Sequence, residues 1–287
     1  MKKYLLILLN LLIPVLLFAQ YDAYLIYNSK GKKTDFEKVL KKISNSDIIF
    51  FGESHNDPIA HWLELKLIKD LPELADGQVI AGAEMFETDH QLILDEYFAG
   101  YFDDRRFEQG ARLWKNYKTD YKPFLLAARE AGIPFVATNI PRRYANMVSN
   151  GGFEALEKLS DEARQFIAPL PVPYDPDLPV YKDMLEMSMG HGHVSKNFPK
   201  AQAIKDATMA HFILKNFEEG MHFIHINGSY HSDNYTGIIW YLNKYQPGLD
   251  IKTITTVSQD DIYELKEENK TKADFIIVVP SDMTRTY

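Results

Sequence analysis

Short runs of apolar residues alternate along the chain with longer stretches in which apolar and polar residues recur at helical spacing. Several of the short runs are nearly continuous in Val, Ile and Phe, which is typical of strands buried on both faces of a mostly parallel sheet. The predicted strands cover residues 47–52, 78–84, 133–139, 221–227, 251–257 and 275–279. The pattern therefore predicts an α/β fold with right-handed crossovers.

Capping residues mark the helices that separate these strands. Asn56 and Asp57 precede the first predicted helix, Thr88 precedes the second, and Gly132 follows the third. The predicted helices cover residues 58–71, 89–99, 123–131 and 201–217.

Two connections are too long to be simple crossovers. One runs from about residue 87 to 132 and the other from about 141 to 220, and the second contains the proline-rich segment 169–179. We expect extra helices there that form a helical cap, roughly 87–132 and 150–218, on a single α/β domain spanning 20–287.

The N-terminal segment differs from the rest of the chain. Lys2 and Lys3 precede an apolar run over residues 5–18, and Ala19 follows it. This order is typical of a secretory signal peptide over residues 1–19. The alternative is a membrane anchor, but the run is shorter than the roughly 20 residues that span a bilayer. We therefore expect an exported, periplasmic protein.

The composition excludes several kinds of site. The sequence contains no cysteine, which excludes disulfides, iron–sulfur clusters, cysteine-ligated zinc and a lipobox anchor. The formal net charge of −8 argues against nucleic acid as a partner.

Polar side chains follow four of the predicted strands. Glu53 and His55 follow the first strand, Glu84 ends the second, Asn139 ends the third, and His231 follows the fourth. Because ligands of open α/β sheets bind beyond the carboxyl ends of the strands, these side chains form a candidate site.

Two arrangements of this site are open. The motif Gly-x-x-His occurs at 52–55 and again at 228–231, where glycine allows the chain to turn at the strand exit. The imidazoles and carboxylates could bind a divalent metal with an open position for water or substrate. They could equally form a metal-free acid–base set. Asp206, an acid in an apolar helix, indicates a cap or a buried hydrogen bond toward this site.

The ordered motifs resemble the ChaN family of haem-binding proteins, within the wider Tiki/erythromycin-esterase-like superfamily. The resemblance covers nearly all of the mature chain and implies an α/β domain with a helical cap, haem binding, and a role in haem and iron acquisition at the bacterial envelope. The motifs that carry it are FFGESHNDP at 50–58, AGAEMFETDHQ at 81–91, YKPFLLAARE at 121–130, IPFVATNIPR at 133–142, AQAIKDATMAHFI at 201–213 and INGSYHSDNYTGI at 226–238.

The resemblance also implies the haem ligands. Haem ligation in the family is by a tyrosine with a histidine nearby, and a phenolate favours ferric iron. Tyr121 and Tyr181 are the candidate ligands, with His191 or His193 assisting. Arg142 is a candidate partner of the haem propionates.

Partners and an alternative function follow from the same resemblance. It implies a homodimer with a cofacial haem pair and an outer-membrane haem receptor as candidate partners. By analogy with the Tiki branch, His55, Glu84 and His231 would be metal ligands with Glu53 nearby, so the alternative function is a metal-dependent hydrolase. Many members are anchored through a cysteine, whereas here Gln20 follows Ala19, so we expect a released protein.

Overall fold

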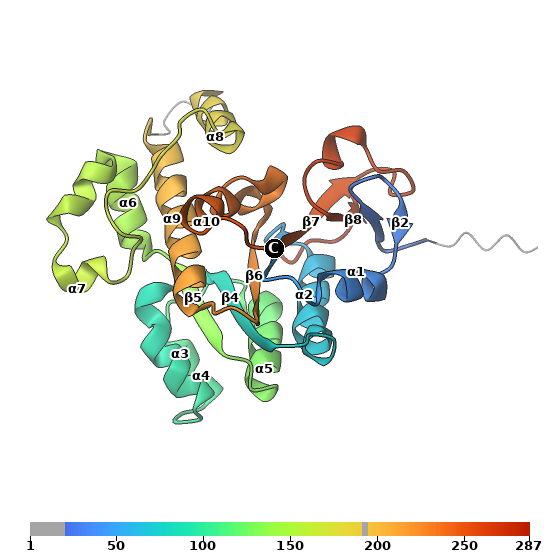
Figure 1. Ribbon diagram of the computed structural model, residues 1–287, viewed down its shortest axis with the longest axis horizontal. Helices are drawn as coiled ribbons and strands as arrows, with labels where there is room; N and C mark the ends of the chain where they lie inside the picture. The colour runs from blue at the N-terminus through green and yellow to red at the C-terminus, as the bar shows by residue number, and fades with distance from the viewer. Residues whose placement is uncertain (1–20, 191–194) are drawn as a thin grey trace, which may run out of the picture.

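A mostly parallel, eight-stranded sheet with helices on both faces forms the centre of the molecule (Figure 1). This computed structural model describes residues 21–190 and 195–287. All six predicted strands are present, and the predicted α/β fold class is confirmed. They are β3 (Ile48–Glu53), β4 (Gln78–Glu87), β5 (Phe135–Asn139), β6 (Met221–Gly228), β7 (Ile251–Gln259) and β8 (Phe275–Pro280).

The strand order places the predicted strand ends side by side. The sheet runs β2-β1-β8-β7-β3-β6-β4-β5, and every pair from β8 to β5 is parallel. Two short strands that were not predicted, β1 (Leu25–Asn28) and β2 (Lys33–Thr34), extend one edge in antiparallel pairing. The strands β3, β6 and β4 are adjacent near the middle, so their carboxyl ends share one edge.

Each face of the sheet is covered by its own helices. Phe51 packs into one apolar cluster with α1 (Phe36–Ile43), α2 (Pro58–Asp70), α3 (Gln91–Phe98) and α5 (Lys122–Glu130). Its neighbour Phe50 points to the opposite face and packs with α6 (Arg142–Gly151), α9 (Phe198–Asn216) and α10 (Ile238–Tyr245). This alternation of neighbouring side chains is the expected geometry of a strand buried on both faces.

The two long connections supply both flanking and peripheral helices. Within them α5 packs against α2 and α9 packs against β5, so both belong to the layers beside the sheet. The remaining helices are α4 (Asp104–Gly110), α7 (Asp161–Arg164) and α8 (Pro179–Gly190), and in Figure 1 they lie toward the margin of the molecule. A π-helical turn (Tyr117–Tyr121) leads into α5 and contacts α2, so it lies beside the sheet with these two helices. Short 3-10 turns cover Leu71–Glu73, Thr88–His90, Phe153–Lys158, Ser229–His231, Asp233–Tyr235 and Glu267–Asn269.

In the part of the chain that the structure describes, no helix has the length and apolar character needed to cross a membrane. The predicted signal peptide lies outside the described residues.

Candidate functional site

The carboxyl ends of β3, β4 and β6 bring the predicted polar residues to one edge of the sheet. Glu53 pairs in register with Gly228, and Ala83 pairs with Ile226. The side chains that follow therefore converge, and Glu53, Glu84 and His231 are all buried. They do not form one cluster, however, but two.

The first cluster is centred on the buried imidazole of His231. Its Nε2 lies 3.2 Å from Glu84 Oε1, and its Nδ1 donates a hydrogen bond to Asp206 Oδ1. The other oxygens of the two carboxylates are also bonded. Glu84 Oε2 accepts from the backbone N–H of Gly228 at 2.8 Å, and Asp206 Oδ2 accepts from the Tyr181 hydroxyl at 2.8 Å. Of the two roles expected for Asp206, a cap or a buried hydrogen bond toward the site, the structure shows the hydrogen bond.

The charges of this cluster stabilise one another. Burial alone would lower the pKa of His231, but Glu84 and Asp206 outweigh it and raise that pKa to about 9. Burial would likewise raise the pKa of Glu84, whereas His231 holds it well below its usual range. His231 is therefore protonated near neutral pH and faces the ionised Glu84, whereas burial raises the pKa of Asp206 in spite of the opposing effect of His231.

The second cluster is centred on the carboxylate of Glu53. Its Oε1 accepts hydrogen bonds from His55 Nδ1 at 2.7 Å and from the Tyr121 hydroxyl at 3.0 Å. Its Oε2 lies 2.7 Å from Nε2 of His61, a residue of α2. Burial raises the pKa of Glu53, but the contacts with His55 and His61 lower this pKa by more than burial raises it. The net shift is therefore downward.

Three residues of this second cluster were not among the predicted site residues. His61 and Glu64 come from the inner face of α2, and Asp120 comes from the π-helical turn. All three are buried, and His61 Nδ1 lies 3.5 Å from Asp120 Oδ1. A signal was present in the sequence, because His61 and Glu64 share a helix face with the apolar Leu67 and Ile68.

The two clusters meet at Gly228. A Cβ placed on this glycine would lie 2.8 Å from the His55 ring and 3.4 Å from Glu84 Oε2. A larger residue here would therefore displace the imidazole of His55, because this ring lies directly against the glycine. Among the described residues, the predicted set of Glu53, His55, Glu84 and His231 is thus brought to one edge but divided between two clusters.

The predicted haem ligands are placed very differently from one another. Tyr121 and Tyr181 are almost fully buried, and each hydroxyl donates to a carboxylate. Burial raises the pKa of both phenols well above the usual value, with the adjacent carboxylate as the next cause. Arg142 is exposed at the start of α6. His191 and His193 lie outside the described residues.

The side chains of His55 and Tyr230 at this edge each combine an atom that can bind iron with exposure to solvent. The His55 side chain is 34% exposed, and its Nδ1 is held by Glu53. Tyr230, which directly precedes His231, is 57% exposed. His55 and Tyr230 each follow by two positions a residue of the register pair Glu53–Gly228, so both lie at the same sheet edge. Tyr230 was not predicted, although it lies inside the second Gly-x-x-His motif.

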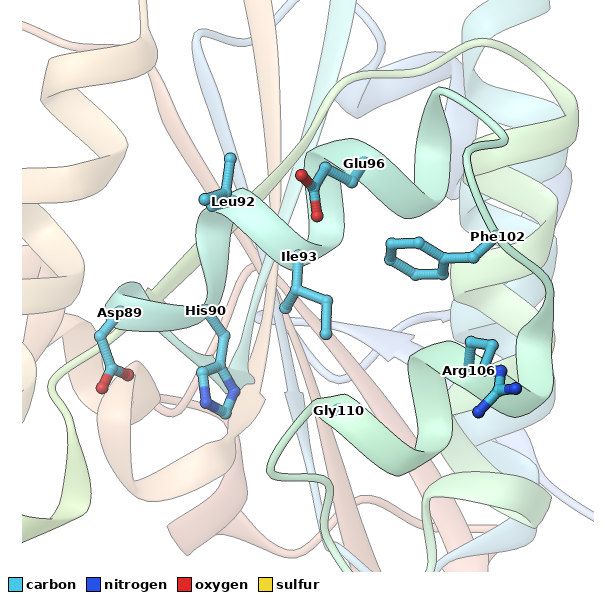
Figure 2. Close-up of a pocket in the computed structure, with 8 residues that line it drawn as sticks. All are labelled: Asp89, His90, Leu92, Ile93, Glu96, Phe102, Arg106 and Gly110. Atoms are coloured by element: carbon cyan, nitrogen blue, oxygen red, sulfur yellow. The ribbon is translucent and has the colours of Figure 1, made fainter.

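A separate surface pocket of about 330 Å³ lies between α3 and α4 (Figure 2). His90, Ile93, Phe102 and Arg106 are among its lining residues. Its volume is at the lower end of the roughly 300–1,000 Å³ that small-molecule sites occupy. The His90 Nδ1 accepts a hydrogen bond from the backbone N–H of Arg112, which holds this ring in place.

Solved structures place this architecture in a known class of α/β proteins. ChaN of Campylobacter jejuni, whose structure is described as showing cofacial haem binding, has a TM-score of 0.68 and 17% identity, over 89% of this chain and 96% of that chain. A protein from Bacillus cereus has a TM-score of 0.50 and 12% identity, over 86% of this chain and 92% of that chain. At these identities the likeness shows the fold alone.

Sequence comparison then gives the family. The model of the family described as "Haem-binding uptake, Tiki superfamily, ChaN" matches residues 39–242. This chain belongs to that ChaN family of the Tiki superfamily, as its motifs suggested.

A curated relative is found outside bacteria. The chloroplastic protein RETICULATA-RELATED 5 of Arabidopsis thaliana is 24% identical over 155 residues, which is 52% of this chain and 21% of that protein. The chain thus spans about a fifth of the length of this relative.

Proposed function

We propose that this protein binds haem at the carboxyl edge of its sheet and serves haem and iron acquisition at the bacterial envelope. Membership of the ChaN haem-binding family is the observation that supports haem as the ligand. The edge is suited to binding iron because it carries His55. Among the predicted site histidines that the structure describes, His55 alone has an imidazole that is partly exposed and held by a carboxylate.

His55 and Tyr230 are the ligands that the geometry favours. A metal-binding imidazole commonly uses one nitrogen for the metal while the other donates to a carboxylate, which fixes the ring. Glu53 fixes Nδ1 of His55 in this way and leaves Nε2 for a ligand. Tyr230 offers an exposed phenol nearby, and Tyr is an established axial haem ligand. Trp114, whose ring centroid lies 4.9 Å from that of His55, would provide an apolar wall.

Tyr121 and Tyr181 remain the alternative ligands. Either phenol would have to leave its carboxylate and reach the surface before it could bind iron, since both are buried. This rearrangement would expose a buried carboxylate, so we favour Tyr230 over both.

Ferric haem added to residues 20–287 is expected to shift the Soret band and to bind in a saturable manner. Tyr230→Phe and His55→Ala should each weaken haem binding about 10- to 100-fold, as the loss of a ligand or of its orientation typically does. Tyr121→Phe and Tyr181→Phe should leave the affinity unchanged. Absorbance titration measures all four variants, with Tyr101→Phe as a control because that tyrosine is 76% exposed on another surface.

Two outcomes would contradict parts of this proposal. A wild-type protein without a Soret shift would overturn haem binding itself. If Tyr121→Phe or Tyr181→Phe weakened binding while Tyr230→Phe did not, the haem would instead be held by a tyrosine that is buried in the haem-free structure.

Export and assembly complete the proposal. The leader 1–19 would direct the protein to the periplasm, and two copies would enclose a cofacial haem pair that an outer-membrane haem receptor supplies or accepts. Light scattering before and after haem addition tests the assembly, because haem should then convert monomers into dimers. A monomer that binds haem would contradict the cofacial arrangement and leave haem binding intact.

A metal-dependent hydrolase is the second candidate function. The observation in its favour is that His231 Nε2 and Glu84 Oε1 lie 3.2 Å apart with His55 next to them, a spacing that two ligands of one ion can have. If this site holds a metal, it would lower the pKa of a bound water for attack on substrate. Metal content should then fall in His55→Ala and His231→Ala, and an unchanged content in both would contradict this candidate.

A further inference from the structure

Behind His55, three chemically active side chains are enclosed between β3 and α2. Glu53 comes from the last position of β3, and His61 and Glu64 come from the first two turns of α2. Their exposed fractions are 1%, 6% and 0%. Neither haem binding nor the Glu84–His231 cluster requires His61 or Glu64.

These three side chains carry polar atoms that have no hydrogen-bond partner. The atoms are Glu53 Oε2, both nitrogens of His61 and both carboxylate oxygens of Glu64. The 2.7 Å approach of His61 to Glu53 therefore lacks the geometry of a hydrogen bond. Buried polar groups are almost always paired, and leaving a carboxylate unpaired is especially unfavourable. The presence of five such atoms in one place indicates that these side chains bind a further group.

The orphan atoms face one another. One ligand atom from each of Glu53, His61 and Glu64 lies within 4.8 Å of the other two, the one such group found among the described residues. A tetrahedral ion with bonds of about 2.1 Å places its ligand atoms roughly 3.4 Å apart, so adjustments of about an ångström would close the group around an ion. Asp120, 3.5 Å from Nδ1 of His61, is placed to orient the ring as second-shell carboxylates do.

We propose that Glu53, His61 and Glu64 form a buried site for a divalent transition-metal ion, separate from the haem-binding edge. One imidazole and two carboxylates suit Zn²⁺ or Mn²⁺ better than a thiolate-preferring ion. The site is closed, and the ion ties the start of α2 to the end of β3. Through Glu53, whose other oxygen holds His55, the ion also fixes the position of the imidazole at the sheet edge.

A shared proton is the competing explanation of the same geometry. Burial and the nearby carboxylate of Glu53 raise the pKa of Glu64 well above its usual value, so Glu64 would be neutral without a metal. Glu64→Gln separates the two cases. Glutamine replaces a protonated glutamate at little cost, whereas it is a poor replacement for a carboxylate that binds a metal.

The test uses haem-free protein of residues 20–287 from cells grown with added zinc or cobalt. After dialysis against EDTA, elemental mass spectrometry should find about one metal ion per chain, because a buried ion is retained until the chain unfolds. The cobalt form should show visible d–d absorption. Glu64→Gln and His61→Ala should each retain about tenfold less metal. Glu73→Gln, an exposed carboxylate just after α2, should retain as much as wild type.

Two results would overturn the site. One is wild-type protein that carries no metal and shows no cobalt absorption, with Glu64→Gln equally stable, which would assign the cluster to a shared proton. The other is metal retained in both Glu64→Gln and His61→Ala but lost in His231→Ala, which would place the ion at the Glu84–His231 pair. Because the wild-type measurement is independent of the variants, a variant that fails to fold does not prevent the decision.

Discussion

Replacing Glu84 with leucine is expected to lower the free energy of unfolding by about 3–5 kcal/mol, the cost of removing one partner from a buried ion pair. The leucine fills a similar volume but leaves the buried N–H of Gly228 without its acceptor. It also leaves His231 with only one of its two carboxylates. Both losses occur in the interior, where water cannot replace the missing partner.

Glu84→Gln is the matched control for this prediction. Its side-chain oxygen can still accept from Gly228, whereas its NH2 group takes the place of the oxygen that faces His231. Only the interaction with His231 is then lost, and we expect a smaller destabilisation. Urea unfolding of the three proteins at pH 7, with equal slopes, measures the difference. If the leucine and glutamine variants were equally stable, the hydrogen bond to Gly228 would contribute nothing and the interpretation of the cluster would be wrong.

The sheet and its functional edge were predictable because they depend on short-range patterns. Continuous apolar runs marked the six buried strands, and the residue after each strand had to lie at the carboxyl edge. Neighbouring strands then placed Glu84 close to His231, since β4 and β6 pair directly. Asp206 was also recognisable, because a lone acid on an apolar helix needs a buried partner.

The contacts between layers could not be predicted in the same way. Whether Glu53 meets His61 or Glu84 depends on how α2 rotates and how closely it approaches β3, which no local pattern specifies. Asp120 reaches His61, and Tyr121 reaches Glu53, from a π-helical turn that lies just before α5. The edge strands β1 and β2 were missed because each is too short to show a clear alternation.

The choice among tyrosines shows the same limit. A motif match selected Tyr121, and closeness in sequence to His191 and His193 selected Tyr181, but neither criterion contains information on exposure. The structure buries both rings against carboxylates and exposes Tyr230, which lies one residue from a predicted site residue. Burial is decided by the packing of whole layers, so sequence alone could name the motif but not the accessible phenol within it.

Stability is expected to fall by up to about 3 kcal/mol between pH 6.5 and pH 9. In the folded protein Glu84 and Asp206 raise the pKa of His231 to about 9, after burial has acted in the opposite direction. In the unfolded chain this histidine titrates near pH 6.5. The stabilisation is therefore complete below the unfolded pKa and is lost as the pH rises through the folded one.

A second buried histidine, His225, makes stability fall as the pH drops below about 6.5. Together, the two histidines therefore give a pH of maximum stability. Burial lowers the pKa of His225 to about 4, so its proton is bound less readily in the folded state and stability falls as the pH drops from about 6.5 toward 4. Urea unfolding across pH 4 to 9.5 should thus show greatest stability near pH 6.5. In Glu84→Gln the alkaline slope should flatten, because His231 loses one cause of its raised pKa, while the acid slope produced by His225 should persist. An alkaline slope that is unchanged in this variant would mean that another group titrates there and that His231 is not the imidazolium on which the first cluster depends.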